Sequence, residues 1–140
     1  MYPQDCSIRR ISDLSSKPIN VNRFNNKTLL IVFGSTDCPA NPLANPVLNK
    51  IYSKFSGQDL EILNIYTTES AATVQKYKSA NDLKFPLYIA ERELHSTYKV
   101  LGTPNFYVVG TDGKIKSAID GYSDQLESKL VRVIEEELGK

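Results

Sequence analysis

Two kinds of hydrophobic spacing alternate along the chain and predict a layered α/β domain. Residues 28–33 form a continuous apolar and β-branched run, which is typical of a strand buried on both faces. Further strands are predicted over 7–11, 19–21, 60–65, 85–89, 106–109 and 115–119. Helical spacing predicts helices over 43–57, 69–80 and 91–100, and a last helix capped by Ser123 with a stripe of Leu126, Leu130, Ile134 and Leu138. An Asp112-Gly113 turn signal joins the last two strands into a hairpin.

Length and charge narrow the class of protein. The 140 residues fit a single domain spanning 1–140, in which residues 1–10 form a loose N-terminal segment. A net charge of +1 excludes the broad basic surface that nucleic-acid binding requires. The longest apolar run, residues 29–33, is far shorter than the roughly 20 residues of a membrane-spanning helix. The sequence also shows no basic and apolar pattern of a secretory signal.

The strongest chemical signal is the segment of residues 33–42, where the buried strand ends and a helix begins. Cys38 lies at this junction. The first turn of a helix has unpaired N–H groups and a partial positive charge, and both favour a thiolate over a thiol. Cys38 is therefore the candidate nucleophile.

Residues around Cys38 resemble those of a known family. Pro46 follows Cys38 by eight residues, Gly102-Thr103-Pro104 precedes the predicted hairpin, and 83–87 read Leu-Lys-Phe-Pro-Leu. In these features the chain, over roughly residues 11–138, resembles the TlpA/ResA group of extracytoplasmic thiol-disulfide proteins. The resemblance implies a thioredoxin-like three-layer domain, with a central mixed sheet, helices on both faces and a cis Thr103–Pro104 bond. It also implies a periplasmic or extracytoplasmic location in bacteria, and protein or small-molecule thiols and disulfides as partners.

Two positions depart from the family pattern of Cys-x-x-Cys preceded by Trp. Asn41 stands where the second cysteine is expected, and Asp37 stands in place of the tryptophan. The second thiol of such a pair attacks the mixed disulfide and releases the product, which Asn41 cannot do. The dithiol cycle is therefore not expected. The Asp37 carboxylate is expected to oppose thiolate formation at Cys38.

Structural interpretations of these residues stay open. Asn41-Pro42 has the pattern of a helix N-cap followed by a first-turn proline, whereas the alternative places Cys38 itself at the N-cap with Pro39 after it. Cys38 is accordingly either a reactive thiol or an inert one.

The other cysteine and the histidine carry weaker signals. Cys6 is either a remote resolving thiol or the partner of Cys38 in a structural disulfide, or else a free or tail cysteine or one that pairs between chains. We favour the second pair of interpretations. His95 is the only histidine and has no partner residues at metal-ligand spacing, so no metal site and no cofactor are expected.

Two related families fit less well. Copper proteins of the Sco type need a second cysteine where Pro42 stands and a histidine where Asn105 stands. Peroxiredoxins have Pro and Thr at the positions of Ile31 and Ser35.

The sequence leaves two functional hypotheses. In the first, Cys38 forms mixed disulfides as a monothiol oxidoreductase that relies on an external thiol. In the second, the chain is a redox-inactive binding module that holds an extended peptide in the groove between Cys38 and Pro104. Residues expected to line this groove are Asp37, Pro39, Asn41, Thr103 and Pro104.

Overall fold

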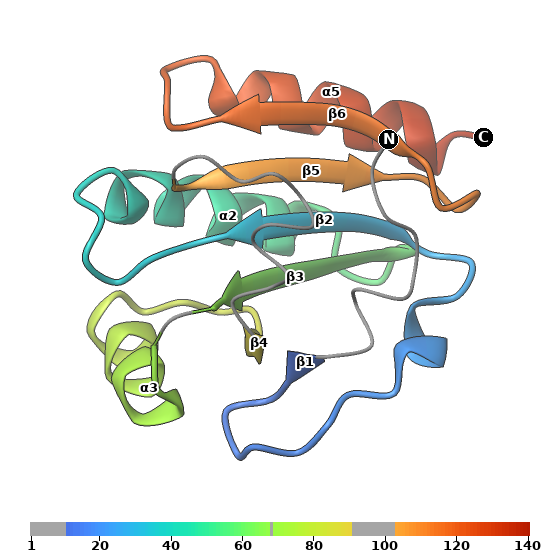
Figure 1. Cartoon of the computed structure of the whole chain (residues 1–140). Coiled ribbons are helices and arrows are strands. Elements are labelled where there is room, and N and C mark those ends of the chain that lie inside the picture. The colour runs from blue at the N-terminus through green and yellow to red at the C-terminus, as the bar shows by residue number, and fades with distance from the viewer. Residues whose placement is uncertain (1–10, 68, 91–102) are drawn as a thin grey trace.

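The computed structural model describes residues 11–67, 69–90 and 103–140, and a mixed β-sheet forms its centre (Figure 1). Its strands are β1 (Ile11–Ser12), β2 (Thr28–Phe33), β3 (Leu60–Tyr66), β4 (Leu87–Ala90), β5 (Asn105–Val109) and β6 (Ile115–Asp120). The described helices are the 3-10 helix η1 (Val21–Phe24) and the α-helices α2 (Asn41–Lys54), α3 (Ala71–Ala80) and α5 (Leu126–Leu138). The strand order across the sheet is β1-β4-β3-β2-β5-β6.

Strand β2 lies between a parallel and an antiparallel neighbour, and this arrangement positions the loop that follows it. β2 runs parallel to β3 and antiparallel to β5. Phe33, the last residue of β2, pairs with Ile65 on one side and with Asn105, the first residue of β5, on the other. The segment after Phe33 and the segment before Asn105 therefore meet at the same edge of the sheet.

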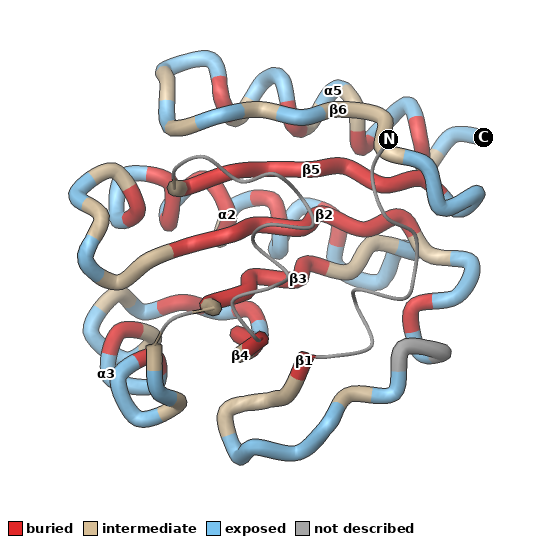
Figure 2. Tube along the Cα trace, in the orientation of Figure 1, coloured by how far each residue is buried: buried red, intermediate tan, exposed pale blue. Residues whose placement is uncertain are grey.

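The two faces of the sheet bury separate hydrophobic clusters. Every residue of β2 and β5 is buried, as the red tube in Figure 2 shows. The helices α2, α3 and α5 pack against one face, and α2 and α5 lie behind the sheet in Figure 1. On the other face, Phe24 of η1 packs with β-strand residues such as Ile31 and Tyr107. A ring of Tyr107 meets Phe33 edge-on, with 6.1 Å between ring centroids and an interplanar angle of 82°.

The predicted elements agree with the structure where local pattern decides. The strand predicted over 28–33 is confirmed, and the strand predicted over 85–89 occurs as β4. The strand predicted over 19–21 is wrong, because the chain turns there into η1, with the Arg23 N–H donating to the Asn20 carbonyl at 3.2 Å. The helix predicted over 91–100 and most of the strand predicted over 7–11 lie outside the described residues.

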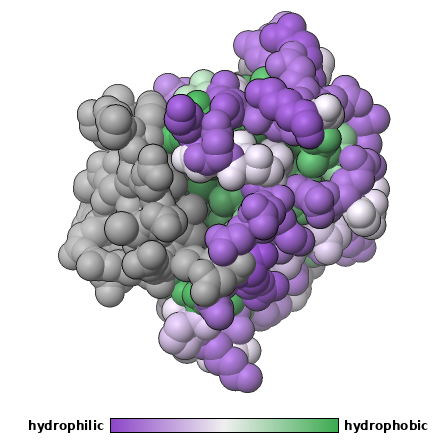
Figure 3. All heavy atoms as spheres, turned by 90° about the vertical axis from the view of Figure 1, so that its right-hand side faces the viewer, coloured by the Kyte–Doolittle hydropathy of each residue, from purple (hydrophilic) through white to green (hydrophobic). Residues whose placement is uncertain are grey.

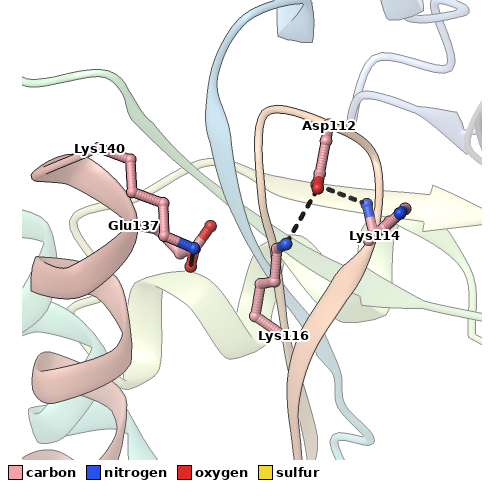
Figure 4. Close-up of polar contacts among 5 residues, drawn as sticks. All are labelled: Asp112, Lys114, Lys116, Glu137 and Lys140. Atoms are coloured by element: carbon pink, nitrogen blue, oxygen red, sulfur yellow. Dashed lines mark hydrogen bonds and ion pairs between the residues drawn. The ribbon is translucent and has the colours of Figure 1, made fainter.

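Charged side chains pair on the surface at the end of the sheet that lies far from the Cys38 loop. Figure 3 views the molecule from that side, where hydrophilic residues cover most of the described surface and hydrophobic ones form small patches. In Figure 4 Asp112, in the β5–β6 turn, pairs with Lys116 at 2.9 Å and accepts from the Lys114 N–H at 3.1 Å. Nearby, Lys140 pairs with Glu137 of α5 at 2.8 Å.

Helix α5 differs from its prediction at its N-terminal end. Gln125 is the N-cap and makes no side-chain cap hydrogen bond, so the prediction of a Ser123 cap is wrong; the Ser123 carbonyl accepts from the Leu126 N–H at 3.0 Å instead. Near the C-terminal end of α5, Glu137 is buried, whereas Glu135 and Glu136 are exposed. Within the described residues, no helix is both long enough and apolar enough to cross a membrane.

Candidate active site

Cys38 lies in a short loop that connects the end of β2 to the start of α2. The loop begins at Gly34, whose N–H donates to the Ile65 carbonyl at 3.0 Å. A Cβ atom at Gly34 would lie 3.0 Å from Asn41 Oδ1 and 3.1 Å from the Tyr66 ring, so this close approach favours glycine. Two turns then follow, because the Cys38 N–H donates to Ser35 O and the Asn41 N–H donates to Cys38 O. The thiol is half-buried beside the helix start.

The loop brings Cys38 against Thr103, which is 65 positions away in the sequence. Cys38 Sγ donates to the Thr103 carbonyl oxygen at 3.0 Å. The Thr103–Pro104 peptide bond, for which the resemblance implies a cis form, is cis in the structure. Pro104 is buried and its carbonyl accepts from the Gly121 N–H at 2.8 Å. The nucleophile candidate and the proline segment are therefore direct neighbours.

The surroundings of Cys38 lower the pKa of its thiol. The largest cause is the hydrogen bond with the Thr103 side chain, and the backbone groups of Ala40 and Asn41 act in the same direction. Desolvation by burial opposes them. The Thr103 carbonyl accepts from the S–H group and so stabilises the neutral thiol. The Thr103 side chain instead favours the thiolate. The net effect favours the thiolate.

The helix start differs from both sequence interpretations. Helix α2 begins at Asn41, and its N-cap is Ala40, which makes no side-chain cap hydrogen bond. The predictions that Asn41 or Cys38 is the cap are therefore wrong. Asp37 and Pro39 are exposed, and the pKa of Cys38 is lowered although the Asp37 carboxylate was expected to oppose thiolate formation.

Asn41 is a buried partner of α3 and makes three polar contacts. Asn41 is only 4% exposed, and its Nδ2 donates to the Tyr77 hydroxyl at 2.7 Å. Its Oδ1 accepts from the Ser35 N–H at 3.3 Å, and the side chain also hydrogen-bonds with Tyr66. The residue expected to line the groove is thus directed into the interior, where it fixes the Cys38 loop to two tyrosines.

This polar cluster extends beneath the loop. Asn45, one turn after Asn41, donates to the same Tyr77 hydroxyl at 3.0 Å. The Tyr66 hydroxyl donates to Asn64 Oδ1 at 3.1 Å, and Asn64 in turn donates to the Val32 carbonyl at 3.2 Å. Burial raises the pKa of Tyr66, so its hydroxyl stays protonated. The base of the loop is therefore a hydrogen-bonded set of neutral groups.

Glu69 holds the loop from another direction. It directly precedes Ser70, the N-cap of α3, and both of its carboxylate oxygens accept from the Thr36 N–H at 3.1 Å. Thr36 is two residues before Cys38. Figure 1 shows the β2–α2 loop and α3 on the same side of the molecule.

The sequence analysis missed Tyr77, Asn45 and Glu69. Each acts on a residue 32 to 36 positions away, so no local spacing indicates the contact. A weak signal was present in Asn45, because an amide among the apolar positions of a helix requires a buried partner. Cys6 and His95 lie outside the described residues. Among the residues that are described, no three His, Cys, Asp or Glu side chains gather as a metal site would require.

Comparison with known proteins identifies a matching family and similar relatives. A model of the AhpC/TSA family matches residues 5–118. The thiol-disulfide oxidoreductase ResA of Bacillus thuringiensis subsp. konkukian is 29% identical over 126 residues, which are 88% of this chain and 73% of that protein.

Solved structures share the fold at lower identity. The thioredoxin domain of a thiol-disulfide oxidoreductase from Bacteroides vulgatus has a TM-score of 0.78 at 18% identity, covering 96% of this chain and 99% of that one. A secreted disulfide oxidoreductase from Mycobacterium tuberculosis has a TM-score of 0.74 at 19% identity, covering 88% and 94%. The fold is therefore thioredoxin-like.

Proposed function

The chain belongs to the AhpC/TSA family, and on that premise we propose that it is a thiol-disulfide oxidoreductase that acts through the single thiol of Cys38. The observation that carries the proposal is the placement of Cys38 beside Thr103 at the start of α2, where its pKa is lowered. A lowered pKa increases the fraction of thiolate, which is the species that attacks a disulfide.

The proposed reaction is thiol-disulfide exchange and needs no added oxidant. The Cys38 thiolate attacks one sulfur of a partner disulfide, and a new S–S bond forms as the old one breaks. The second partner sulfur leaves as a thiolate and takes a proton from water. An external thiolate then attacks the partner's sulfur in the mixed disulfide, and Cys38 leaves again as a thiolate.

Asn41 accounts for the need for an external thiol. It occupies the position of the resolving cysteine, and its amide is engaged with Tyr77 and Ser35. A carboxamide has no thiolate with which to attack a disulfide. The mixed disulfide on Cys38 is therefore expected to persist until a second thiol arrives.

The proposed partner is an extended polypeptide or a small thiol that reaches Cys38 beside Thr103 and Pro104. Asp37 and Pro39 are exposed on the same loop and lie where such a partner would approach. The proposed location is periplasmic or extracytoplasmic. The similarity to a disulfide oxidoreductase described as secreted supports this location, and fractionation of cells that produce the native gene product tests it.

Peroxide reduction is not the function we propose, although the AhpC/TSA family is named after peroxide-reducing enzymes. Ile31 and Ser35 stand where peroxiredoxins have Pro and Thr, and Ile31 is buried in the sheet core. Reduction of a peroxide by Cys38 would therefore have to proceed without the Pro and Thr that peroxiredoxins have at these positions.

The test measures formation of the mixed disulfide with glutathione disulfide, followed by mass spectrometry of the intact protein. The Cys6→Ser protein leaves Cys38 as the single thiol, and Cys6→Ser/Cys38→Ser is the control without one. We expect one glutathione adduct, formed faster than on free cysteine at neutral pH and absent from the control. A rate equal to or below that of free cysteine would contradict the proposal and favour the redox-inactive binding module.

A further inference from the structure

Glu69 makes a contact that the exchange chemistry at Cys38 does not itself require. The side chain crosses from the start of α3 to the Cys38 loop, and both oxygens accept from one N–H, that of Thr36. Glu69 is only partly exposed, and its side chain reaches a residue 33 positions away in the sequence.

The loop has few other fixed points between Gly34 and the helix. The Cys38 N–H to Ser35 O bond is long, at 3.3 Å, and so is the Asp37 N–H to Ser35 Oγ bond. The contact of Ser35 with Asn41 is likewise 3.3 Å. The Thr36–Glu69 contact is shorter, and it lies midway between Gly34 and Cys38.

Correct placement of this loop matters for the sulfur. Cys38 Sγ has to lie beside Thr103 and within reach of the backbone N–H groups of Ala40 and Asn41. Hydrogen bonds weaken steeply as their angles and distances depart from the optimum. A loop that moves by a fraction of an ångström would therefore lose part of the interaction that favours the thiolate.

We propose that Glu69 is a positioning residue, which holds the backbone of the Cys38 loop through Thr36 and thereby sets the reactivity of the thiol. The inference rests on the proposed function of Cys38. It assigns the effect to the reach of the carboxylate and to its acceptor oxygens, because Glu69 is not among the groups that shift the pKa of Cys38 directly.

Three substitutions separate reach from charge. Glu69→Gln keeps the length and one acceptor oxygen but removes the charge. Glu69→Asp keeps the charge but shortens the side chain by one methylene group, and Glu69→Ala removes both features. Glu136→Ala, at an exposed position of α5, is the matched control.

The measurement is the rate of Cys38 alkylation by iodoacetamide as a function of pH, in full-length protein carrying Cys6→Ser. We expect Glu69→Gln and Glu136→Ala to keep the wild-type midpoint. We expect Glu69→Asp and Glu69→Ala to raise it by about half a pH unit, which lowers the thiolate fraction about threefold below the midpoint. Circular dichroism verifies that each variant is folded, and if Glu69→Ala does not fold, the Gln and Asp variants carry the test.

The outcomes distinguish this inference from the proposed function. If every folded Glu69 variant has the same alkylation midpoint as the wild type, the positioning role is overturned. The proposed function still stands in that case, provided that the wild-type protein is alkylated faster than free cysteine. A Gln variant as impaired as Ala, with Asp like the wild type, would also overturn it, because charge and not reach would then matter. Alkylation of the wild type no faster than that of free cysteine would overturn both.

Discussion

The two ends of the sheet hold their loops by different chemistry. At the Cys38 end, Asn41 is buried and bonds to the Tyr77 hydroxyl at 2.7 Å. At the other end, the side-chain contact of the β5–β6 turn is the Asp112–Lys116 ion pair, whose side chains are 48% and 25% exposed. A buried polar group costs about 1–3 kcal/mol when its partner is removed, whereas exposed ion pairs contribute little. The difference indicates that the candidate site is fixed more firmly than the turn at the opposite end.

The largest change we expect is a gain of dithiol activity in Asn41→Cys. The substitution supplies the resolving thiol one helical turn after Cys38, so an internal disulfide can form and release the partner. Turnover of insulin reduction with dithiothreitol should be absent in the wild type and measurable in the variant. Asn45→Cys, one turn further along α2, is the control and should stay inactive. A folded Asn41→Cys protein that forms no disulfide with Cys38 would show that the loop lacks the required geometry.

A second prediction concerns stability at the same position. Asn41→Ala leaves the Ser35 N–H without its partner and removes one of the two amide donors to the buried Tyr77 hydroxyl, so it should lower the free energy of unfolding by about 2–3 kcal/mol. Asn49→Ala, on the same helix, removes two exposed contacts with Lys84 and Asp82 and should cost about 1 kcal/mol or less. Urea denaturation measures both. Equal losses would mean that burial does not distinguish the two amides.

Tyr77→Phe sharpens the comparison from the side of α3. The hydroxyl accepts from both Asn41 and Asn45, so its removal leaves two buried amide donors and should cost about 1–2 kcal/mol. Tyr52→Phe is the control, because Tyr52 is 42% exposed, and its unfolding midpoint should not change. If Tyr77→Phe is as stable as the wild type, the polar cluster does not stabilise the loop.

The smallest effect is expected in the β5–β6 turn. The hydrogen bond from Lys116, and then that from the Lys114 N–H, lowers the pKa of Asp112 in the folded protein. The unfolded state therefore binds a proton at higher pH, and the contribution of Asp112 to stability is lost as the pH falls through the folded-state pKa. Asp112→Asn should remove a small part of the stability loss that occurs as the pH falls from about 5 to about 2. Asp124→Asn, another exposed acid, is the control for urea midpoints, and an equal change in both variants would contradict the assignment to Asp112.

Local pattern predicted the fold because the sheet is encoded in short apolar runs. Residues 28–33 form a continuous apolar and β-branched run that is typical of a buried strand, and α5 carries Leu126, Leu130 and Ile134 on one buried face. Residues 19–21 were predicted wrongly as a strand, because two β-branched residues around an asparagine do not outweigh the turn that follows at Arg23.

The candidate site was predicted only in part, for a physical reason. The position of Cys38 follows from the strand-to-helix junction, and its neighbour Thr103 follows from the family resemblance. The role of Asn41 does not follow, because a helix-cap rule considers only the residues that come next in the chain. Its partner Tyr77 lies on another helix, and only the packing of α3 against α2 brings the two together.

The central claim is that the surroundings of Cys38 make its thiol reactive, and the pH dependence of its alkylation tests this most directly. In the Cys6→Ser protein, we expect a midpoint below the usual value for cysteine, about 8.5. Replacing Thr103 by valine, which removes the hydroxyl, should move that midpoint upward, since the Thr103 side chain is the largest cause of the shift. A wild-type midpoint at or above the usual value, with no change in the Thr103→Val protein, would contradict the claim.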